Sequence, residues 1–333
     1  MKPISTVSIL GAGSWGTAVA VHLASYVPKV LLWSHDAKKI ADMKQDKLNR
    51  QYLPDIYFPE TVIPIADLNE AVARADYTII AVPSHAFKSV LQQINVPLQS
   101  LSWLTKGLDP DTNALLSDIA ISFYNDEFPL AVISGPSFAK EVAQNMPTAL
   151  TIASKDVKLQ RDLHRIFHHQ HLRAYLSDDI VGVQICGAVK NVLAIACGVS
   201  DGMGFGANAR AALITRGLAE MRRLGIQLGA KEETFMGLAG VGDLVLTCTD
   251  NQSRNRRFGL KLGSSMDALE AETSIGQVVE GKHNAAQVCT LARKYQIDMP
   301  ICEQVYLLIQ EKITLDQAIE NLFKRPPKDE SNV

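Results

Sequence analysis

Short apolar runs alternate with longer amphipathic segments through the first half of the chain. Apolar runs rich in β-branched residues predict strands over residues 4–10, 29–33, 77–82, 102–105, 130–134 and 148–153. Apolar residues at helical spacing predict helices between them, over 15–25, 37–48, 85–94 and 111–121. Strands separated by helices of this length are typical of βαβ units around a mostly parallel sheet. The first half therefore predicts an α/β fold with a Rossmann-type, doubly wound parallel sheet.

The pattern changes near residue 175. From there on, Ala, Leu and Ile recur at helical spacing, as over 183–199, 210–224 and 300–310. We therefore predict a Rossmann domain over 1–177, an all-α C-terminal domain over 178–323 and a flexible charged tail over 324–333.

The charge balance excludes one class of partner. The chain has 333 residues, with 33 Lys and Arg against 35 Asp and Glu and a formal charge of −2. A general nucleic-acid binder normally carries a basic excess, so we expect no nucleic-acid partner. Small anionic ligands held by a few local charges stay compatible with this balance.

Two further observations bear on the compartment. The five cysteines form no C-x-x-C pair, which favours isolated thiols in a reducing compartment. The first residues lead directly into a predicted strand, and no apolar run approaches the roughly 18 residues of a membrane span. We expect a cytoplasmic protein without a membrane span.

A glycine motif follows the first predicted strand. Gly11, Gly13 and Gly16 form G-x-G-x-x-G between a strand and a helix. In this setting the first glycine allows a tight turn, the second allows close approach of a pyrophosphate, and the third allows close packing of helix on strand. The pyrophosphate would then meet free N–H groups at the helix N-terminus. The motif predicts a dinucleotide site.

The end of the second predicted strand bears on the choice of cofactor. A site for NAD usually places Asp or Glu there to hold the ribose 2′-hydroxyl. Here Ser34 and His35 occupy this neighbourhood, and Lys38 and Lys39 follow. The role of Asp36 has two interpretations: it binds the ribose, or it is the N-cap of the next helix. We favour NADP, with NAD tolerated.

Polar residues interrupt apolar or glycine-rich stretches at five further places. These segments are residues 105–107, 134–139, 188–192, 240–244 and 251–257. Lys190 lies within an apolar helical stretch, where burial without a partner would be costly, although a snorkelling side chain is the alternative. Asp243 lies in a glycine-rich turn and could be only a turn or cap residue. The Ser-Arg-Asn-Arg-Arg run is either a solvated basic face or a phosphate clamp.

Several long motifs together resemble bacterial glycerol-3-phosphate dehydrogenase (NAD(P)+). They are GAGSWGTA at 11–18, TKG at 105–107, SGPSFAKE at 134–141, AVKNV at 188–192, GVGDLVLTCTDNQSRNRRFG at 240–259 and GQVVEG at 276–281. The resemblance covers essentially the whole chain. It implies NAD(P)-dependent interconversion of dihydroxyacetone phosphate and sn-glycerol 3-phosphate, a small phosphorylated substrate, and a role in phospholipid synthesis.

The resemblance also implies roles for individual residues. Lys190 matches the catalytic lysine of the family. Positions that contact glycerol phosphate match Lys106, Gly135, Ser137, Lys190, Asp243, Ser253, Arg254 and Asn255. Positions that contact the cofactor match Ser14, Trp15, His35, Lys106, Ala139, Arg254, Val278 and Glu280, beside the glycines of the turn.

A mechanism follows as an expectation. Arg254 with its neighbours would anchor the phosphate, and Lys190 would polarise and protonate the carbonyl oxygen. Burial and repulsion from Lys106 would lower the pKa of Lys190, whereas Asp243 would raise it, and the sequence leaves the balance open.

Two other functions stay open. A β-hydroxyacid dehydrogenase has a similar layout and a catalytic lysine, and a non-catalytic NADP-binding redox sensor would need only the glycine turn. We expect no metal site, although four histidines fall between 164 and 171. The apolar C-terminal helices would suit either a homodimer interface or a single domain core.

Overall fold

The structure is a computed structural model that describes residues 3–326. It divides into two compact units. The first holds the residues up to Thr105 together with Leu116–Ile180, and the second holds Lys106–Leu115 and the residues from Val181 onward. From residue 327 on, the tail expected over 324–333 lies outside the described residues.

The segment Lys106–Leu115 differs from the sequence prediction, which placed it in the Rossmann domain. In the structure, Leu108 and Leu115 pack into the core of the helical unit. The side-chain amide of Gln287 also donates to the carbonyl oxygen of Leu108 at 3.2 Å. An excursion of this kind leaves no mark in local periodicity, because the packing partners lie far along the chain.

The first unit is built on an eight-stranded sheet in the order β10-β9-β8-β7-β6-β1-β2-β5. Its strands are β1 (Thr6–Leu10), β2 (Lys29–Trp33), β5 (Val62–Ile65), β6 (Tyr77–Ile80), β7 (Leu101–Trp103), β8 (Leu130–Ser134), β9 (Thr148–Ser154) and β10 (Leu172–Ser177). A separate antiparallel pair joins β3 (Leu48–Asn49) to β4 (Leu53–Tyr57). Neighbouring strands of the large sheet run parallel, except that β8 and β9 are antiparallel.

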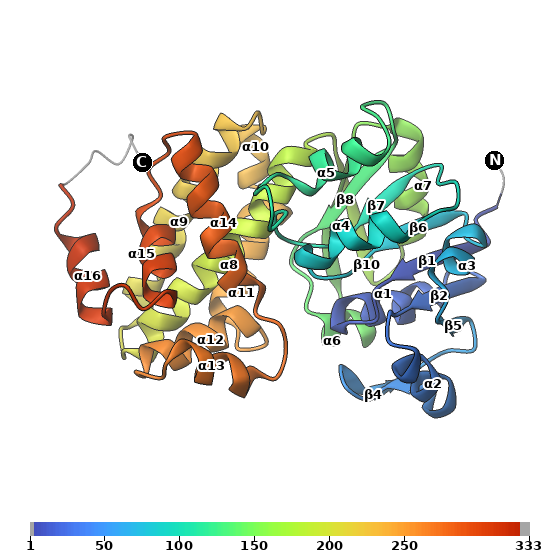
Figure 1. Ribbon diagram of the computed structural model, residues 1–333, viewed down its shortest axis with the longest axis horizontal. Helices are drawn as coiled ribbons and strands as arrows, with labels where there is room; N and C mark the ends of the chain where they lie inside the picture. The colour runs from blue at the N-terminus through green and yellow to red at the C-terminus, as the bar shows by residue number, and fades with distance from the viewer. Residues whose placement is uncertain (1–2, 327–333) are drawn as a thin grey trace. The chain divides into compact units, whose positions relative to one another are not determined.

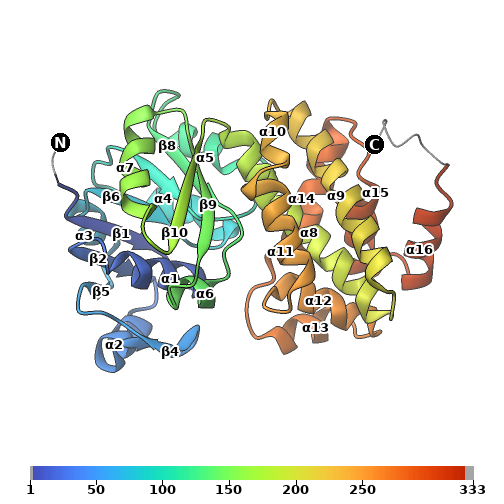
Figure 2. The same ribbon diagram turned by 180° about the vertical axis from the view of Figure 1, so that it is seen from behind.

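Helices cover both faces of this sheet. The helices of the first unit are α1 (Ser14–Leu23), α2 (Ala37–Asp46), α3 (Leu68–Ala73), α4 (Ser84–Gln93), α5 (Leu116–Phe123), α6 (Ala139–Ala143) and α7 (Val157–Phe167). Successive strand side chains point to opposite faces, so Val7 and Ile9 pack with α1 and α7 in one core cluster. Figure 1 shows α4 and α5 in front of the sheet, and Figure 2 shows α7 on the face behind it. The predicted doubly wound fold is confirmed.

The second unit is helical. Its elements are α8 (Ile180–Gly202), α9 (Ala207–Gln227), α10 (Glu232–Phe235), a π-helical turn η1 (Leu238–Gly242), α11 (Asp243–Thr249), α12 (Arg254–Gly263), α13 (Ala268–Ile275), α14 (Glu280–Lys294), α15 (Pro300–Ile309) and α16 (Leu315–Phe323). In Figure 1, α8 runs through the middle of this group. Its neighbours therefore cover it on several sides.

Helix α8 is long and apolar enough to cross a membrane, which the sequence analysis did not expect. However, 89% of its apolar window is buried within the structure. Its residues, among them Val189, Val192 and Ile195, belong to the core of the helical unit. Packing on several sides explains why the helix lacks a polar face.

Backbone contact joins α8 to α12. Gly198 and Gly202 of α8 face Gly259 and Gly263 of α12, each pair four residues apart on its helix. A Cβ atom added at Gly259 would lie 2.2 Å from the carbonyl oxygen of Ile195, so only glycine allows this approach. Since Gly198 meets Gly259 and Gly202 meets Gly263, the two helices run in the same direction.

Candidate active site

The glycine turn of the first unit has the geometry of a dinucleotide cradle. Gly11 has φ +131°, and a Cβ there would lie 2.6 Å from the carbonyl oxygen of Ala81. A Cβ at Gly16 would lie 2.0 Å from the carbonyl oxygen of Gly11, so the helix packs directly on the turn. At Gly13 a Cβ would meet nothing within 4 Å, which leaves open space where a pyrophosphate would approach.

The start of α1 also fits an anionic cofactor. Its N-cap is Gly13, and no side chain caps the helix. The indole nitrogen of Trp15 is buried and has no hydrogen-bond partner. Beneath the turn, the buried amide of Asn49 donates to the carbonyl oxygen of Ala12 at 3.0 Å and to Thr17 Oγ1 at 2.8 Å. Asn49, which sequence reasoning missed, holds the turn from β3.

The end of β2 settles the local role of Asp36. Its carboxylate accepts the backbone N–H of Lys39 at 3.0 Å and caps α2, and this bond is the main reason that the pKa of Asp36 is lowered. His35 is exposed beside it. Burial lowers the pKa of Lys39 to about 8, against the opposing effect of Asp36, and its ammonium lies 3.9 Å from the ring centroid of Tyr52. His35 and Lys39 therefore both lie at the end of this strand.

The 134–139 segment lies in the first unit, after β8. Gly135 has φ +146°, and a Cβ there would lie 2.8 Å from Leu150 Cα. The hydroxyl of Ser137 donates to the carbonyl oxygen of Gly135 at 2.9 Å. The helix that begins at Ala139 is only five residues long. The segment is thus a strained turn with a short helix, and the substrate role of Gly135 and Ser137 stays a prediction.

A buried ionic cluster of Lys106, Lys190 and Asp243 forms the centre of the second unit's candidate site. Asp243 Oδ2 lies 2.7 Å from Lys106 Nζ, and Asp243 Oδ1 lies 2.5 Å from Lys190 Nζ. Lys190 Nζ also donates to Thr247 Oγ1 at 3.0 Å, and that hydroxyl donates to the carbonyl oxygen of Asp243 at 2.6 Å. Lys190 and Asp243 are 5% and 1% exposed, so the snorkelling interpretation of Lys190 is excluded.

Burial and charge set the protonation of this cluster. Burial lowers the pKa of Lys190 to about 7, against attraction by Asp243 and with a further contribution from the positive charge of Lys106. For Asp243, burial opposes ionisation, yet the two ammonium groups outweigh it and lower its pKa. Asp243 is therefore a carboxylate, and Lys190 is poised to gain or lose a proton near neutral pH.

The 251–257 run leads into α12 and forms its first turn from Arg254 onward. Ser253 is the N-cap, and its hydroxyl accepts the backbone N–H of Arg256 at 3.2 Å. Arg254 is half-buried, with Nη1 at 3.4 Å from Gln277 Oε1. Asn255 links two helices: its amide donates to Asn191 Oδ1 on α8 at 2.9 Å and accepts the N–H of Gly281 on α14 at 2.9 Å.

Glu280 places the start of α14 beside the same cations. Burial raises the pKa of this half-buried carboxyl, while Arg254, Lys106 and Lys190 lower it. Together with the Asn191–Asn255 bond, this interaction shows that Lys106, Lys190, Arg254 and Glu280 surround one locality of the helical unit. Val278, two residues before Glu280, is 37% exposed.

Comparisons with known proteins agree with this arrangement. The family model of the NAD-dependent glycerol-3-phosphate dehydrogenase N-terminus matches residues 6–160, and that of the C-terminus matches residues 179–320. Glycerol-3-phosphate dehydrogenase [NAD(P)+] of Legionella pneumophila (strain Paris) is 61% identical over 325 residues, which cover 98% of this chain and 99% of the relative. The chain belongs to the NAD-dependent glycerol-3-phosphate dehydrogenase family.

Other members extend this result. Glycerol-3-phosphate dehydrogenase [NAD(P)+] of Shewanella sediminis is 51% identical over 335 residues, which cover 99% of both chains. The crystal structure of glycerol-3-phosphate dehydrogenase from Coxiella burnetii has a TM-score of 0.93 and 47% identity, covering 97% of this chain and 99% of that one. D-mandelate dehydrogenase, at 15% identity and a TM-score of 0.63, shares the fold alone.

Sequence reasoning missed Thr247 and Asp201, and it missed the hydrogen-bond partner of Asn191. Thr247 lies one helical turn after Asp243, and this spacing was the available signal. Asn191 was noticed only as part of a motif, and its bond to Asn255 needs the packing of α8 on α12. Asp201 carries no sequence signal, yet it pairs with buried Arg256.

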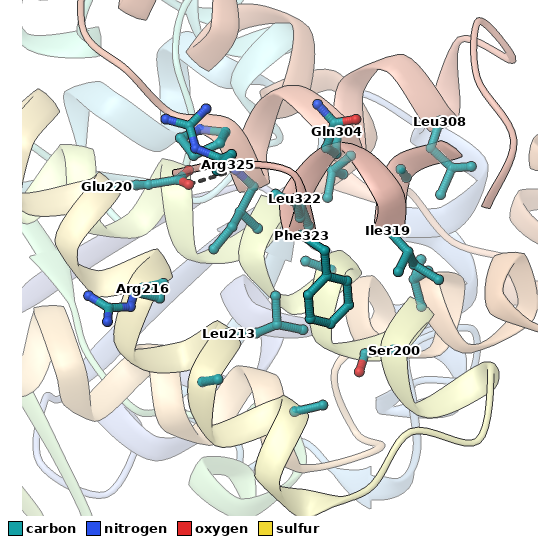
Figure 3. Close-up of a pocket in the computed structure, with 18 of the residues that line it drawn as sticks. Ser200, Leu213, Arg216, Glu220, Gln304, Leu308, Ile319, Leu322, Phe323 and Arg325 are labelled. Atoms are coloured by element: carbon teal, nitrogen blue, oxygen red, sulfur yellow. Dashed lines mark hydrogen bonds between the residues drawn. The ribbon is translucent and has the colours of Figure 1, made fainter. Parts of the chain in front are cut away.

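A hollow in the helical unit is separate from this cluster. Its volume is about 480 Å³, and α8, α9, α15 and α16 line it (Figure 3). Apolar side chains such as Leu213, Ile319 and Phe323 form most of its wall. The cluster lysines and Asp243 do not line it.

Among residues 3–326, no group of three or more His, Cys, Asp or Glu residues could hold a metal ion, and this includes the histidines between 164 and 171.

Proposed function

We propose that this member of the family interconverts dihydroxyacetone phosphate and sn-glycerol 3-phosphate with NAD or NADP, and that Lys190 is its acid–base residue. The observation that carries the proposal is the buried cluster in which Asp243 holds Lys190 at 2.5 Å while the pKa of Lys190 is lowered to about 7. A lysine that changes protonation near neutral pH suits general acid–base catalysis.

The other residues of this locality bind the substrate. Arg254, at the first turn of α12, supplies positive charge to the phosphate, together with Ser253 and Asn255. Lys106 adds a second cation, and Asp243 orients the two lysines. Gly135 and Ser137 complete the proposed substrate set.

Lys190 then manages one proton. In the direction of reduction, its ammonium donates a hydrogen bond to the carbonyl oxygen and transfers the proton as negative charge develops there. The neutral amine left behind has lost its attraction to Asp243, so that carboxylate favours its reprotonation. In the direction of oxidation, the neutral amine accepts the hydroxyl proton.

The cofactor belongs to the glycine turn of the first unit. Gly11, Gly13 and Gly16 shape the cradle, and the uncapped start of α1 offers N–H groups to the pyrophosphate. When bound, the nicotinamide supplies the hydride. The proposed cofactor contacts also include Ser14, Trp15, His35, Lys106, Ala139, Arg254, Val278 and Glu280. We favour NADP over NAD, because Asp36 serves as a helix cap, and His35 and the ammonium group of Lys39 lie near it.

The decisive assay follows NADPH oxidation with dihydroxyacetone phosphate. Lys190→Ala should abolish measurable turnover while NADPH binding persists, and Lys294→Ala, an exposed lysine of the same unit, should behave as wild type. Arg254→Ala should chiefly raise KM for the phosphorylated ketone. Preserved turnover in Lys190→Ala would remove this residue from the chemistry, and comparing KM for NADPH and NADH tests the cofactor preference.

The same assay separates the alternatives. A β-hydroxyacid dehydrogenase would oxidise short hydroxy acids in preference to glycerol 3-phosphate, and Arg254 with Ser253 suits a phosphate better than a carboxylate. A redox sensor would bind NADPH without turnover, which leaves the buried Lys190–Asp243 pair without a purpose.

The physiological setting is a further part of the proposal. We place the enzyme in the cytoplasm, where it supplies glycerol phosphate for phospholipid synthesis, because its five cysteines are all free and buried.

We also propose a homodimer through the helical unit, supported by exposed apolar side chains such as Phe205 and Phe323. Sedimentation analysis tests the dimer, and a monomer at micromolar concentration would exclude it.

A further inference from the structure

A buried ion pair lies at the base of the turn that holds Ser253 and Arg254. Arg256 Nη1 lies 2.5 Å from Asp201 Oδ2, and both side chains are less than 10% exposed. Arg256 Nε donates to Asn251 Oδ1 at 3.0 Å, and Nη1 donates to the carbonyl oxygen of Cys248 at 3.2 Å. The next residue, Arg257, is exposed. Arg256 and Arg257 thus have different environments, although they are adjacent in the sequence.

The contacts of Arg256 join four parts of the helical unit. Asp201 lies at the end of α8, Cys248 near the end of α11, and Asn251 in the connection between α11 and α12, whose first turn carries Arg256 itself. Asp201 Oδ2 also lies 2.7 Å from Arg210 Nη1 on α9. A buried pair of this kind is costly to break, because removal of one partner leaves the other charge unpaired.

These contacts fix the first turn of α12 against α8, the helix that also carries Lys190. Lys190 and Asp201 are eleven residues apart on α8, or about 16 Å at 1.5 Å per residue. The glycine contacts of α8 with α12 set the distance between the two helices. The Asp201 pair then holds the turn from one side, and the Asn191–Asn255 bond ties it to α8 near Lys190.

We propose that Arg256 and Asp201 are positioning residues: they hold Ser253 and Arg254 at the spacing from Lys190 that the substrate phosphate requires. The inference rests on the proposed function for the identity of the ligand. Arg256 acts through Ser253, whose hydroxyl caps the N–H of Arg256 at 3.2 Å, and through the connection that precedes it. The guanidinium of Arg256 is engaged by Asp201, Asn251 and Cys248, so the phosphate is left to Arg254.

The kinetic test compares Asp201→Asn and Arg256→Lys with wild type, using Arg257→Gln as the matched control on the exposed neighbour. KM and kcat are measured with dihydroxyacetone phosphate, with unphosphorylated dihydroxyacetone and with varied NADPH. We expect both variants to raise KM for the phosphorylated ketone about tenfold. Asp201→Asn removes the charge of the pair, and Arg256→Lys removes the guanidinium bonds to Asn251 and Cys248. Values for dihydroxyacetone and NADPH should change less than twofold, and Arg257→Gln should match wild type.

Two results would overturn the proposal. One is an unchanged KM for the phosphorylated ketone in both variants, even with a lowered melting temperature, since the pair would then serve stability alone. The other is an equal loss for the phosphorylated and unphosphorylated ketones, which would place the effect on Lys190 rather than on the phosphate.

A second measurement separates this inference from the proposed function. Calorimetric titration with inorganic phosphate requires no turnover, and we expect Asp201→Asn and Arg256→Lys to bind it more weakly than wild type and Arg257→Gln. Equal phosphate affinity in all four proteins would overturn the positioning role. An inactive wild type that still shows this order of affinities would instead refute the proposed reaction and leave the positioning role intact.

Discussion

Glu220 of α9 caps the N-terminus of α15 from inside the helical unit. One oxygen of its carboxylate accepts the backbone N–H of Ile301 at 2.6 Å, and the other accepts that of Cys302 at 3.1 Å. The side chain is 1% exposed. Burial raises the pKa of Glu220 to about 7, against the opposing effect of these N–H groups and of Arg223.

This shift makes stability depend on pH in a defined direction. Because the folded pKa lies above the unfolded value, the folded state binds more protons between them, so stability falls as pH rises. The contribution of Glu220 is complete below about pH 4.5 and is lost as pH rises through about 7. The difference between 4.5 and about 7 corresponds to about 3 kcal/mol, at roughly 1.4 kcal/mol for each pH unit.

Glu220→Gln removes this titration while keeping the shape of the side chain. At pH 5 we expect the variant to be less stable than wild type, because the amide leaves one N–H of α15 without an acceptor. As pH rises to 8, the difference should shrink or reverse, by about 3 kcal/mol over the range.

Urea unfolding of both proteins at pH 5, 6, 7 and 8, followed by circular dichroism, measures this difference. Glu303→Gln is the matched control on α15, because Glu303 is half-exposed and pairs with Arg293 at the surface. It should change stability by less than about 1 kcal/mol at every pH. A stability difference for Glu220→Gln that stays constant between pH 5 and 8 would refute the reasoning.

Three further predictions concern Lys190, the contact between α8 and α12, and the glycine turn. With the pKa of Lys190 at about 7, kcat for ketone reduction should fall as pH rises through neutrality while kcat for oxidation rises, and parallel pH profiles in both directions would contradict this. Gly259→Ala should lower the free energy of unfolding by at least about 2 kcal/mol, since its Cβ would lie 2.2 Å from a backbone oxygen of α8. Gly206→Ala is the control, because open space surrounds Gly206, and it should lower the free energy of unfolding in urea by less than about 1 kcal/mol. Asn49→Ala should weaken NADPH binding measured by fluorescence titration, because it removes two buried hydrogen bonds beneath the glycine turn; unchanged affinity would show that the turn holds itself.

Much of the fold could be predicted because its signals are local. The strands at 29–33 and 130–134 appear with the predicted bounds, since continuous apolar runs suit strands covered on both faces. The helix predicted over 111–121 begins only at Leu116, because Asp109 accepts bonds from the N–H and hydroxyl of Thr112 and forms a turn there. Strands β5 and β10 were missed, and β5 carries Pro64 on a short strand at the edge of the sheet.

Some residues of the candidate site could likewise be found from the sequence, and others needed the tertiary structure. Lys190 could be found from sequence because a cation in an apolar helix conflicts with its surroundings, and the glycine turn could be found because its spacing is local. By contrast, the sequence did not distinguish Arg256 from Arg257, because both are arginines of one basic run. Only the position of Asp201, 55 residues away along the chain, separates them.

The sequence by itself therefore determined the fold class and the family and singled out the glycine turn and Lys190 as candidates, because each depends on residue types at short spacing. The tertiary structure decided the net direction of the pKa shift of Lys190 and the pairing of Arg256. These depend on burial and on distances of about 3 Å between distant segments. Such quantities arise only when α8, α11 and α12 pack together, since Coulomb energy and desolvation are set by separation in space.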